Sequence, residues 1–100
     1  MKRQSIGDGR WFDREKAICV EENTYFDGNN YVSKATNCQW EHEKLFRTKS
    51  GVWILHHWSQ YQGVKPTWEI IENKQAAEWL VKNGHEPMDE CVDEYAKLEI

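Results

Sequence analysis

The clearest pattern of hydrophobic and polar positions lies between residues 39 and 63, where two aromatic-rich runs flank a turn at residues 48–51. Gly51 suits such a turn because glycine adopts positive φ without a steric cost. A loop of residues 49–51 places Phe46 opposite Ile54. The segment is therefore predicted to be one long antiparallel hairpin, around which the rest of the chain is organised.

Alternation of side chains along the two strands gives this hairpin two different faces. The first face carries Trp40, His42, Lys44, Phe46, Val52, Ile54, His56 and Trp58. The second face carries Glu41, Glu43, Leu45, Arg47, Trp53, Leu55, His57 and Ser59. We expect the first, more apolar face to meet the core. The aromatic residues of the second face are either covered by a helix or another strand, or they form a surface for a partner.

Shorter apolar runs on either side of the hairpin predict further strands at residues 11–12, 17–20, 31–35 and 67–72. Residues 27–30, Asp-Gly-Asn-Asn, are a strong turn signal, and Asn37 is a candidate for the left-handed region. Residues 1–9 are charged and contain two glycines, so we expect this polar N-terminal segment to be poorly ordered or to form a short arm. Residues 10–100 then form the single domain.

The C-terminal part of the chain changes to helical spacing. Asn73 is the expected N-cap of a helix from Lys74 to Asn83, which Gly84 ends in the left-handed conformation. Apolar residues at steps of three and four predict a second helix from about Pro87 to Glu99. Because strands come first and helices follow, we predict an α+β fold. It is an antiparallel β-meander of about four to six strands, packed on one or two C-terminal helices.

Composition narrows the classes of function. The 100 residues suit one domain, and a formal net charge of −4 argues against an extended nucleic-acid surface. No apolar run is long enough to span a membrane. Three widely spaced cysteines imply no disulfide framework, and the polar first ten residues show no signal-peptide pattern. We therefore expect a cytoplasmic protein with reduced thiols.

A longer motif runs through the hairpin and into the first helix. Its residues are Glu43, Leu45-Phe46-Arg47-Thr48, Gly51, Trp53, Leu55, Trp58-Ser59-Gln60, Ala76-Ala77 and Trp79-Leu80. The pattern, L-[YF]-R-T-x-x-G-x-W-x-L followed by A-x-x-W-L, covers about residues 43–83. It resembles a family of small bacterial proteins that often belong to phage-type or mobile gene sets. The resemblance implies a hairpin, a further strand and a helix; it implies no established activity, and so no catalytic residue.

The residues nearest to a chemical site are Cys38, His42 and His56. His42 and His56 share the first face, diagonally across the two strands, and imidazole with thiolate suits zinc. Against zinc, the spacing matches no recognised ligand pattern. The alternative is that both histidines hydrogen-bond neighbouring side chains at the border of the sheet. We expect no cofactor, with zinc at these residues as the alternative.

The leading hypothesis is a small non-enzymatic protein-binding or regulatory module. As the resemblance implies, it would come from a phage or mobile element and act on a host protein. Its predicted surface is Trp53, Tyr61, Trp68, Gln60 and Gln62, used first for a homodimer or directly for another protein. The first alternative is a metal- or small-ligand-binding domain at the His and Cys residues. Nucleic-acid binding is the weaker alternative, because cations are few around these aromatic residues.

Overall fold

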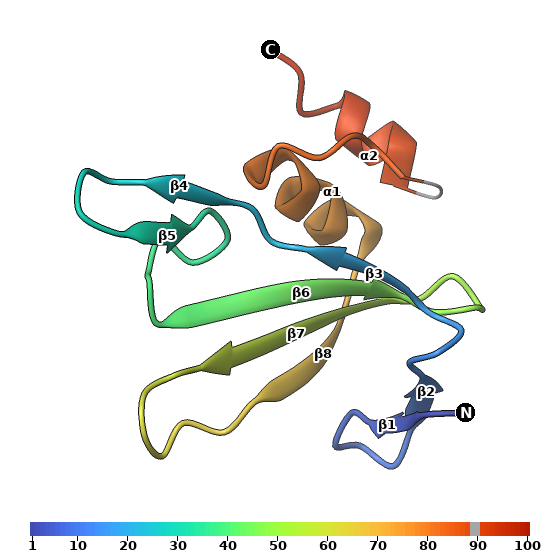
Figure 1. The fold of residues 1–100 in the computed structure, drawn as a ribbon. Helices are drawn as coiled ribbons and strands as arrows, with labels where there is room; N and C mark the ends of the chain where they lie inside the picture. The colour runs from blue at the N-terminus through green and yellow to red at the C-terminus, as the bar shows by residue number, and fades with distance from the viewer. Residues whose placement is uncertain (89–90) are drawn as a thin grey trace.

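A computed structural model describes residues 1–88 and 91–100 (Figure 1). Its centre is an antiparallel sheet with strand order β3-β6-β7-β8. These strands are β3 (Ile18–Glu21), β6 (Glu41–Arg47), β7 (Trp53–Ser59) and β8 (Thr67–Ile71). Two small ribbons stand beside the sheet: β1 (Arg3–Ser5) with β2 (Trp11–Asp13), and β4 (Thr24–Phe26) with β5 (Tyr31–Ser33). With the two helices that the described residues form after β8, this confirms the predicted α+β fold.

The central hairpin, β6–β7, has the predicted register. Phe46 lies opposite Ile54 and His42 lies opposite Trp58. The turn closes through the backbone bond from Thr48 N to Val52 O at 2.9 Å, and the Thr48 hydroxyl accepts the Val52 N–H at 3.0 Å. Gly51 takes a φ of 88°, which explains why a glycine stands there. The hairpin is thus specified by its own local sequence.

Helix α1 (Asn73–Lys82) covers the second face of the hairpin, as Figure 1 shows. The core between them is built from Leu45, Trp53, Ala76, Ala77 and Leu80. Of the two readings of this face, cover by a helix is therefore confirmed. The expectation that the first face meets the main core is wrong, because the apolar stripe of α1 packs on the opposite side of the sheet.

The first face is instead covered in part by the β1–β2 ribbon. Phe12 packs against Phe46 at a ring-centroid distance of 5.5 Å, and both belong to a smaller buried cluster with Ile54. Of the two expectations for residues 1–9, poor order is therefore wrong for residues 3–5: Ser5 pairs with Trp11, and Arg3 pairs with Asp13. The ribbon is held in place because its second strand contributes a large apolar side chain to the sheet.

The β4–β5 ribbon confirms a turn that was predicted from sequence. The Asp27 carboxylate accepts backbone N–H groups from Asn29 at 2.9 Å and Asn30 at 2.8 Å. Asn37, after β5, takes a φ of 58°, in the left-handed region as expected. The ribbon extends beyond the edge of the main sheet (Figure 1). The meander is therefore interrupted between β3 and β6 by a separate hairpin.

Helix α1 begins one residue earlier than predicted. Its N-cap is Glu72 rather than Asn73, because Glu72 and Gln75 form a capping box in which Gln75 Oε1 accepts the Glu72 N–H at 2.9 Å. Gly84 ends the helix at a φ of 71°, as predicted. Helix α2 (Val92–Ala96) is much shorter than the predicted span of 87–99, of which residues 89–90 lie outside the described part.

Candidate functional site

A row of four half-buried rings crosses the first sheet face next to the β1–β2 ribbon. This row, the aromatic ladder, consists of His42, Trp58, His56 and Trp68. Neighbouring ring centroids are 5.5 Å apart between His42 and Trp58, 5.1 Å between Trp58 and His56, and 3.7 Å between His56 and Trp68. Strand alternation places the rings on one face, and the antiparallel register brings β6, β7 and β8 side by side.

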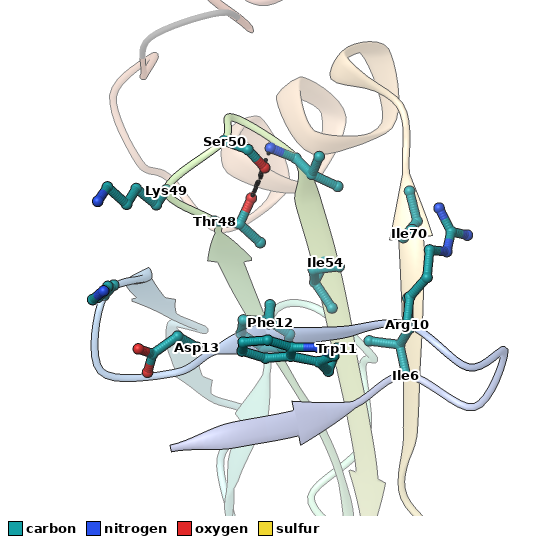
Figure 2. A pocket seen from close by; sticks show the side chains of 12 residues that line it. Ile6, Arg10, Trp11, Phe12, Asp13, Thr48, Lys49, Ser50, Ile54 and Ile70 are labelled. Carbon is teal, nitrogen blue, oxygen red and sulfur yellow. Dashed lines mark hydrogen bonds between the residues drawn. The ribbon is translucent and has the colours of Figure 1, made fainter. Parts of the chain in front are cut away.

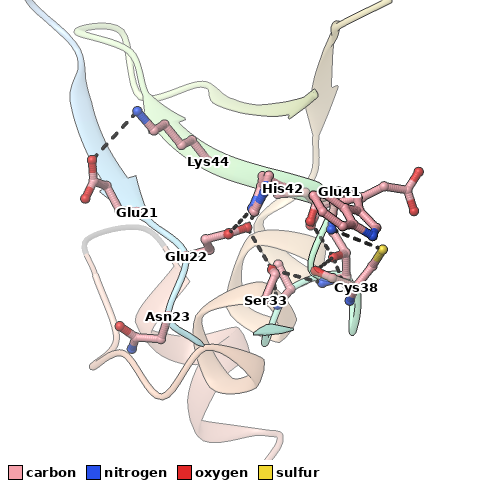
Figure 3. A network of polar contacts seen from close by, with 12 residues as sticks. Glu21, Glu22, Asn23, Ser33, Cys38, Glu41, His42 and Lys44 are labelled. Atoms are coloured by element: carbon pink, nitrogen blue, oxygen red, sulfur yellow. Dashed lines mark hydrogen bonds and ion pairs between the residues drawn. The ribbon is translucent and has the colours of Figure 1, made fainter. Parts of the chain in front are cut away.

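Both imidazoles of the ladder are held through Nδ1. The Nδ1 of His42 lies 2.7 Å from a carboxylate oxygen of Glu22, and the Nδ1 of His56 lies 2.9 Å from the carbonyl oxygen of Thr67 (Figure 3 shows the first contact). A carbonyl oxygen can only accept, so His56 Nδ1 carries the proton. Burial lowers the pKa of His56, so this ring is neutral at physiological pH and its Nε2 is a hydrogen-bond acceptor.

Glu22 connects separate parts of the chain next to His42 (Figure 3). Besides His42, its carboxylate accepts the Ser33 hydroxyl and the Glu43 backbone N–H, each at 2.7 Å. Two of these groups lie on β6 and the third on β5. This arrangement fixes the orientation of His42 and joins the β4–β5 ribbon to the sheet. It does not form a Ser-His-acid triad, because the carboxylate stands between the serine and the histidine.

Two cations lie beside the indole rings of the ladder. Lys44 Nζ is 5.6 Å from the ring centroid of Trp58, and the Arg14 guanidinium carbon is 5.7 Å from that of Trp68. These are cation–π distances. Together with the stacking inside the ladder, these contacts occupy ring faces within the protein. The ladder therefore offers less ring area for stacking of a nucleobase than separate exposed rings would.

A second aromatic feature lies where β6 begins and β7 has ended. Trp40 is 44% exposed and Tyr61 is 52% exposed, and their ring centroids are 6.4 Å apart. We call this pair the aromatic rim. The backbone bond from Gln60 N to Trp40 O, at 2.7 Å, brings the two segments together. Desolvation, with Cys38 nearby, raises the pKa of Tyr61, so the phenol is protonated and can donate a hydrogen bond.

The structure separates the residues that were predicted to contact a partner. Tyr61, Gln60 and Gln62 are exposed at the rim, and Trp68 is half-buried in the ladder. Trp53 is 1% exposed, between the sheet and α1, so its assignment to a contact surface is a correction: the helix covers it. Trp40 was missed by the prediction, although the hairpin register places it beside Gln60.

The predicted metal ligands do not come together. The ring of Trp58 contacts both His42 and His56, and Cys38 Sγ instead accepts the Trp40 backbone N–H at 3.4 Å. Within residues 1–88 and 91–100, no group of three or more His, Cys, Asp and Glu side chains is arranged to hold a metal ion.

An open cavity of about 630 Å³ lies at the other end of the central hairpin. It is bounded by the β1–β2 ribbon and by the turn between β6 and β7 (Figure 2). Its apolar lining is Ile6, Trp11, Phe12, Val52, Ile54 and Ile70. This volume is in the ordinary range for small-molecule sites in proteins.

The fold and these sites define an α+β protein with a row of half-buried aromatic rings on one sheet face and an apolar cavity at the closed end of the central hairpin. No protein-family model, curated protein or solved structure that was compared matches the chain. The resemblance to small phage-type proteins therefore stays a prediction. In the part of the chain that the structure describes, no helix combines the length and apolarity needed to cross a bilayer.

Proposed function

We propose that the protein is a small non-enzymatic binding module whose protein partner contacts the aromatic rim. The observation that carries this proposal is the exposure of Trp40 and Tyr61 at adjacent positions. Tryptophan and tyrosine dominate the binding energy of protein interfaces, because they bury much area while losing few side-chain rotations. An exposed pair of this kind is suited to the centre of a protein-binding surface.

The surroundings of the rim suit a protein partner. Gln60 and Gln62 supply amide donors and acceptors beside the rings, and Val64 adds an exposed apolar side chain. The Tyr61 N–H is bound by the Ser59 hydroxyl at 3.0 Å, which limits movement of the segment before binding. An apolar centre with polar groups at its border is the usual composition of a protein interface.

A regulatory role on a host protein is part of the proposal, and its support is the resemblance to phage-type proteins. Nucleic-acid binding has weaker support, because the chain carries a net charge of −4 and the ladder rings stack on one another. A second copy of the chain is one candidate partner, which the same rim would contact.

The test is affinity capture from a bacterial lysate with three forms of the purified protein. The forms are wild type, a Trp40→Ala/Tyr61→Ala rim variant, and a Phe26→Ala/Tyr31→Ala control that removes two exposed aromatic rings elsewhere. We expect wild type and control to retain the same protein and the rim variant to lose it. Equal retention by all three forms would contradict the proposal.

Sedimentation of the three forms without lysate tests the homodimer. If the partner is a second copy, wild type and control are dimers and the rim variant is a monomer. A dimer that persists in the rim variant would place the interface elsewhere.

A further inference from the structure

The cavity beside the β1–β2 ribbon is distant in the fold from the aromatic rim. The rim lies at the open end of the β6–β7 hairpin, and the cavity lies at its closed end. We infer that this cavity is a binding site for a small amphipathic anion, a molecule with an apolar body and one carboxylate group. This inference does not depend on the proposed protein partner.

The floor of the cavity is apolar and fixed. Phe12 and Ile54 are buried in the same cluster, and Val52 packs against them. Trp11 and Ile70, at the mouth, are exposed apolar side chains. Figure 2 shows Trp11, Phe12, Ile54 and Ile70 around one open space. An apolar ligand body would cover these side chains and remove them from water, which is the main source of affinity in such a site.

Hydrogen bonds hold both walls of the cavity in the absence of a ligand. In the upper wall of Figure 2, the Thr48 and Ser50 hydroxyls are 3.1 Å apart, and the Val52 N–H donates to Thr48. In the ribbon, Ile6 N donates to Arg10 O at 3.1 Å. A site whose walls are already ordered loses less conformational entropy when a ligand binds.

The charges around the cavity favour binding of an anion over a cation. Lys16 and Lys49 line it, and among the described residues neither makes a direct ion pair. The charge of Lys16 helps to lower the pKa of Asp13, so Lys16 is partly compensated and Lys49 is the less compensated of the two. Arg10 also lines the cavity, but its guanidinium is paired with Asp8. The two lysines thus give a positive edge to the cavity of a chain whose net charge is negative.

One carboxylate, that of Asp13, lies in the same lining and opposes an anion. It already accepts backbone N–H groups from Lys2 at 3.1 Å and Glu15 at 3.0 Å. These bonds offset part of its charge at the cavity. Because Lys16 also compensates Asp13, the cavity keeps an excess of one positive charge, that of Lys49. A monoanion fits this balance better than a cation does.

The experiment uses decanoate as the probe, with decanol and decyltrimethylammonium as matched neutral and cationic probes. Binding is followed by amide chemical shifts in two-dimensional nitrogen–proton NMR spectra of the full chain. We expect saturable decanoate shifts at residues 10–13, 48–54 and 70. Decanol and the cation should bind roughly tenfold more weakly, because each lacks the contact with the lysines.

Variants distinguish the contact between the ligand carboxylate and the lysines from the contact between the ligand chain and the apolar lining. Lys16→Gln/Lys49→Gln should weaken decanoate roughly tenfold and leave decanol unchanged, whereas Lys65→Gln/Lys74→Gln, at exposed lysines elsewhere, should change neither. Equal affinity for all three probes would overturn the preference for an anion. Shifts outside the cavity, or none at all, would overturn the site.

Occupation by a second copy is the remaining alternative, and sedimentation distinguishes it. A dimer that decanoate dissociates would show that a neighbouring chain fills the cavity, and this would overturn the small-molecule assignment. A sedimentation coefficient that decanoate leaves unchanged supports it. Because the rim variant keeps the cavity residues, loss of partner capture and loss of decanoate binding can be observed separately.

Discussion

The indole N–H of Trp79 donates to the Glu43 carboxylate at 3.0 Å, which ties α1 to the second face of the sheet. The Trp79 side chain is buried. Glu43 lies on β6, and its half-buried side chain faces α1. Burial raises the pKa of Glu43 above the ordinary value of 4.5, although the Trp79 bond acts in the opposite direction. The charged form of this carboxyl is therefore less favourable in the folded protein.

This relationship predicts how stability depends on pH. With a raised pKa, the folded state binds more protons than the unfolded state between the two pKa values. The contribution of Glu43 to the free energy of unfolding is thus fully present below about pH 4.5. It is lost as pH rises through the folded-state pKa. Glu43→Gln keeps an uncharged acceptor for Trp79. Its free energy of unfolding should exceed that of wild type by an amount that grows with pH.

Urea unfolding at several pH values between about 4 and 7 measures this difference. Glu69→Gln is the control, since Glu69 is an exposed carboxyl on β8, two strands from β6 in the same sheet. A difference between Glu43→Gln and wild type that is the same at every pH would show that burial does not shift this carboxyl.

The packing of α1 on the sheet gives a prediction from two adjacent residues. Leu80 is fully buried in the main core, and Val81 is exposed on the same helix. Leu80→Ala should lower the free energy of unfolding by about 2–5 kcal/mol, because it leaves a cavity. Val81→Ala should change it by less than about 0.5 kcal/mol. Chemical denaturation measures both, and a reversed order would mean that the helix presents another face to the sheet.

The N-terminal ribbon gives a second comparison of neighbours. Phe12 packs on Phe46 and Trp68, whereas Trp11 is exposed with the Arg3 guanidinium 4.9 Å from its ring centroid. Phe12→Ala should lower the free energy of unfolding by about 3–5 kcal/mol, and Trp11→Ala by about 1 kcal/mol or less. If both substitutions are equally mild in thermal unfolding, the ribbon is not docked on the sheet.

A buried amide makes the fourth prediction. Asn83 is fully buried at the end of α1; its side chain accepts the Asn23 N–H at 3.0 Å and donates to the Trp79 carbonyl at 2.9 Å. Asn83→Ala leaves a donor and an acceptor without these partners, which should cost about 1–3 kcal/mol of stability. Asn29→Ala, at an exposed turn, is the control. Equal urea midpoints for the two variants would argue against this bridge.

Local sequence predicted the features whose causes are local. Gly51 and the alternation around Phe46 and Ile54 were sufficient for the hairpin and its register, since the turn and the pleat fix both. The stripe of Ala76, Ala77 and Leu80 was sufficient for α1. The same pattern could not decide which sheet face the helix covers, because both faces carry large apolar side chains.

Features that depend on distant segments were missed. The β1–β2 ribbon is ordered by contact of Phe12 with Phe46, and no pattern inside residues 1–9 reports that contact. Trp53 and Trp40 are both tryptophans of the central hairpin segment. Helix α1 buries Trp53, whereas Trp40 stays exposed. The cavity likewise exists only where the ribbon meets the turn at residues 48–51.

The most direct test of the proposed function is calorimetric titration of the captured partner, once purified, into the wild-type protein and its variants. Loss of a central aromatic pair should weaken the binding free energy by about 2 kcal/mol or more, which corresponds to roughly a thirtyfold rise in Kd. We therefore predict that Trp40→Ala/Tyr61→Ala weakens binding at least to that extent, and that Phe26→Ala/Tyr31→Ala binds as wild type does. An unchanged Kd for the rim variant would contradict the account.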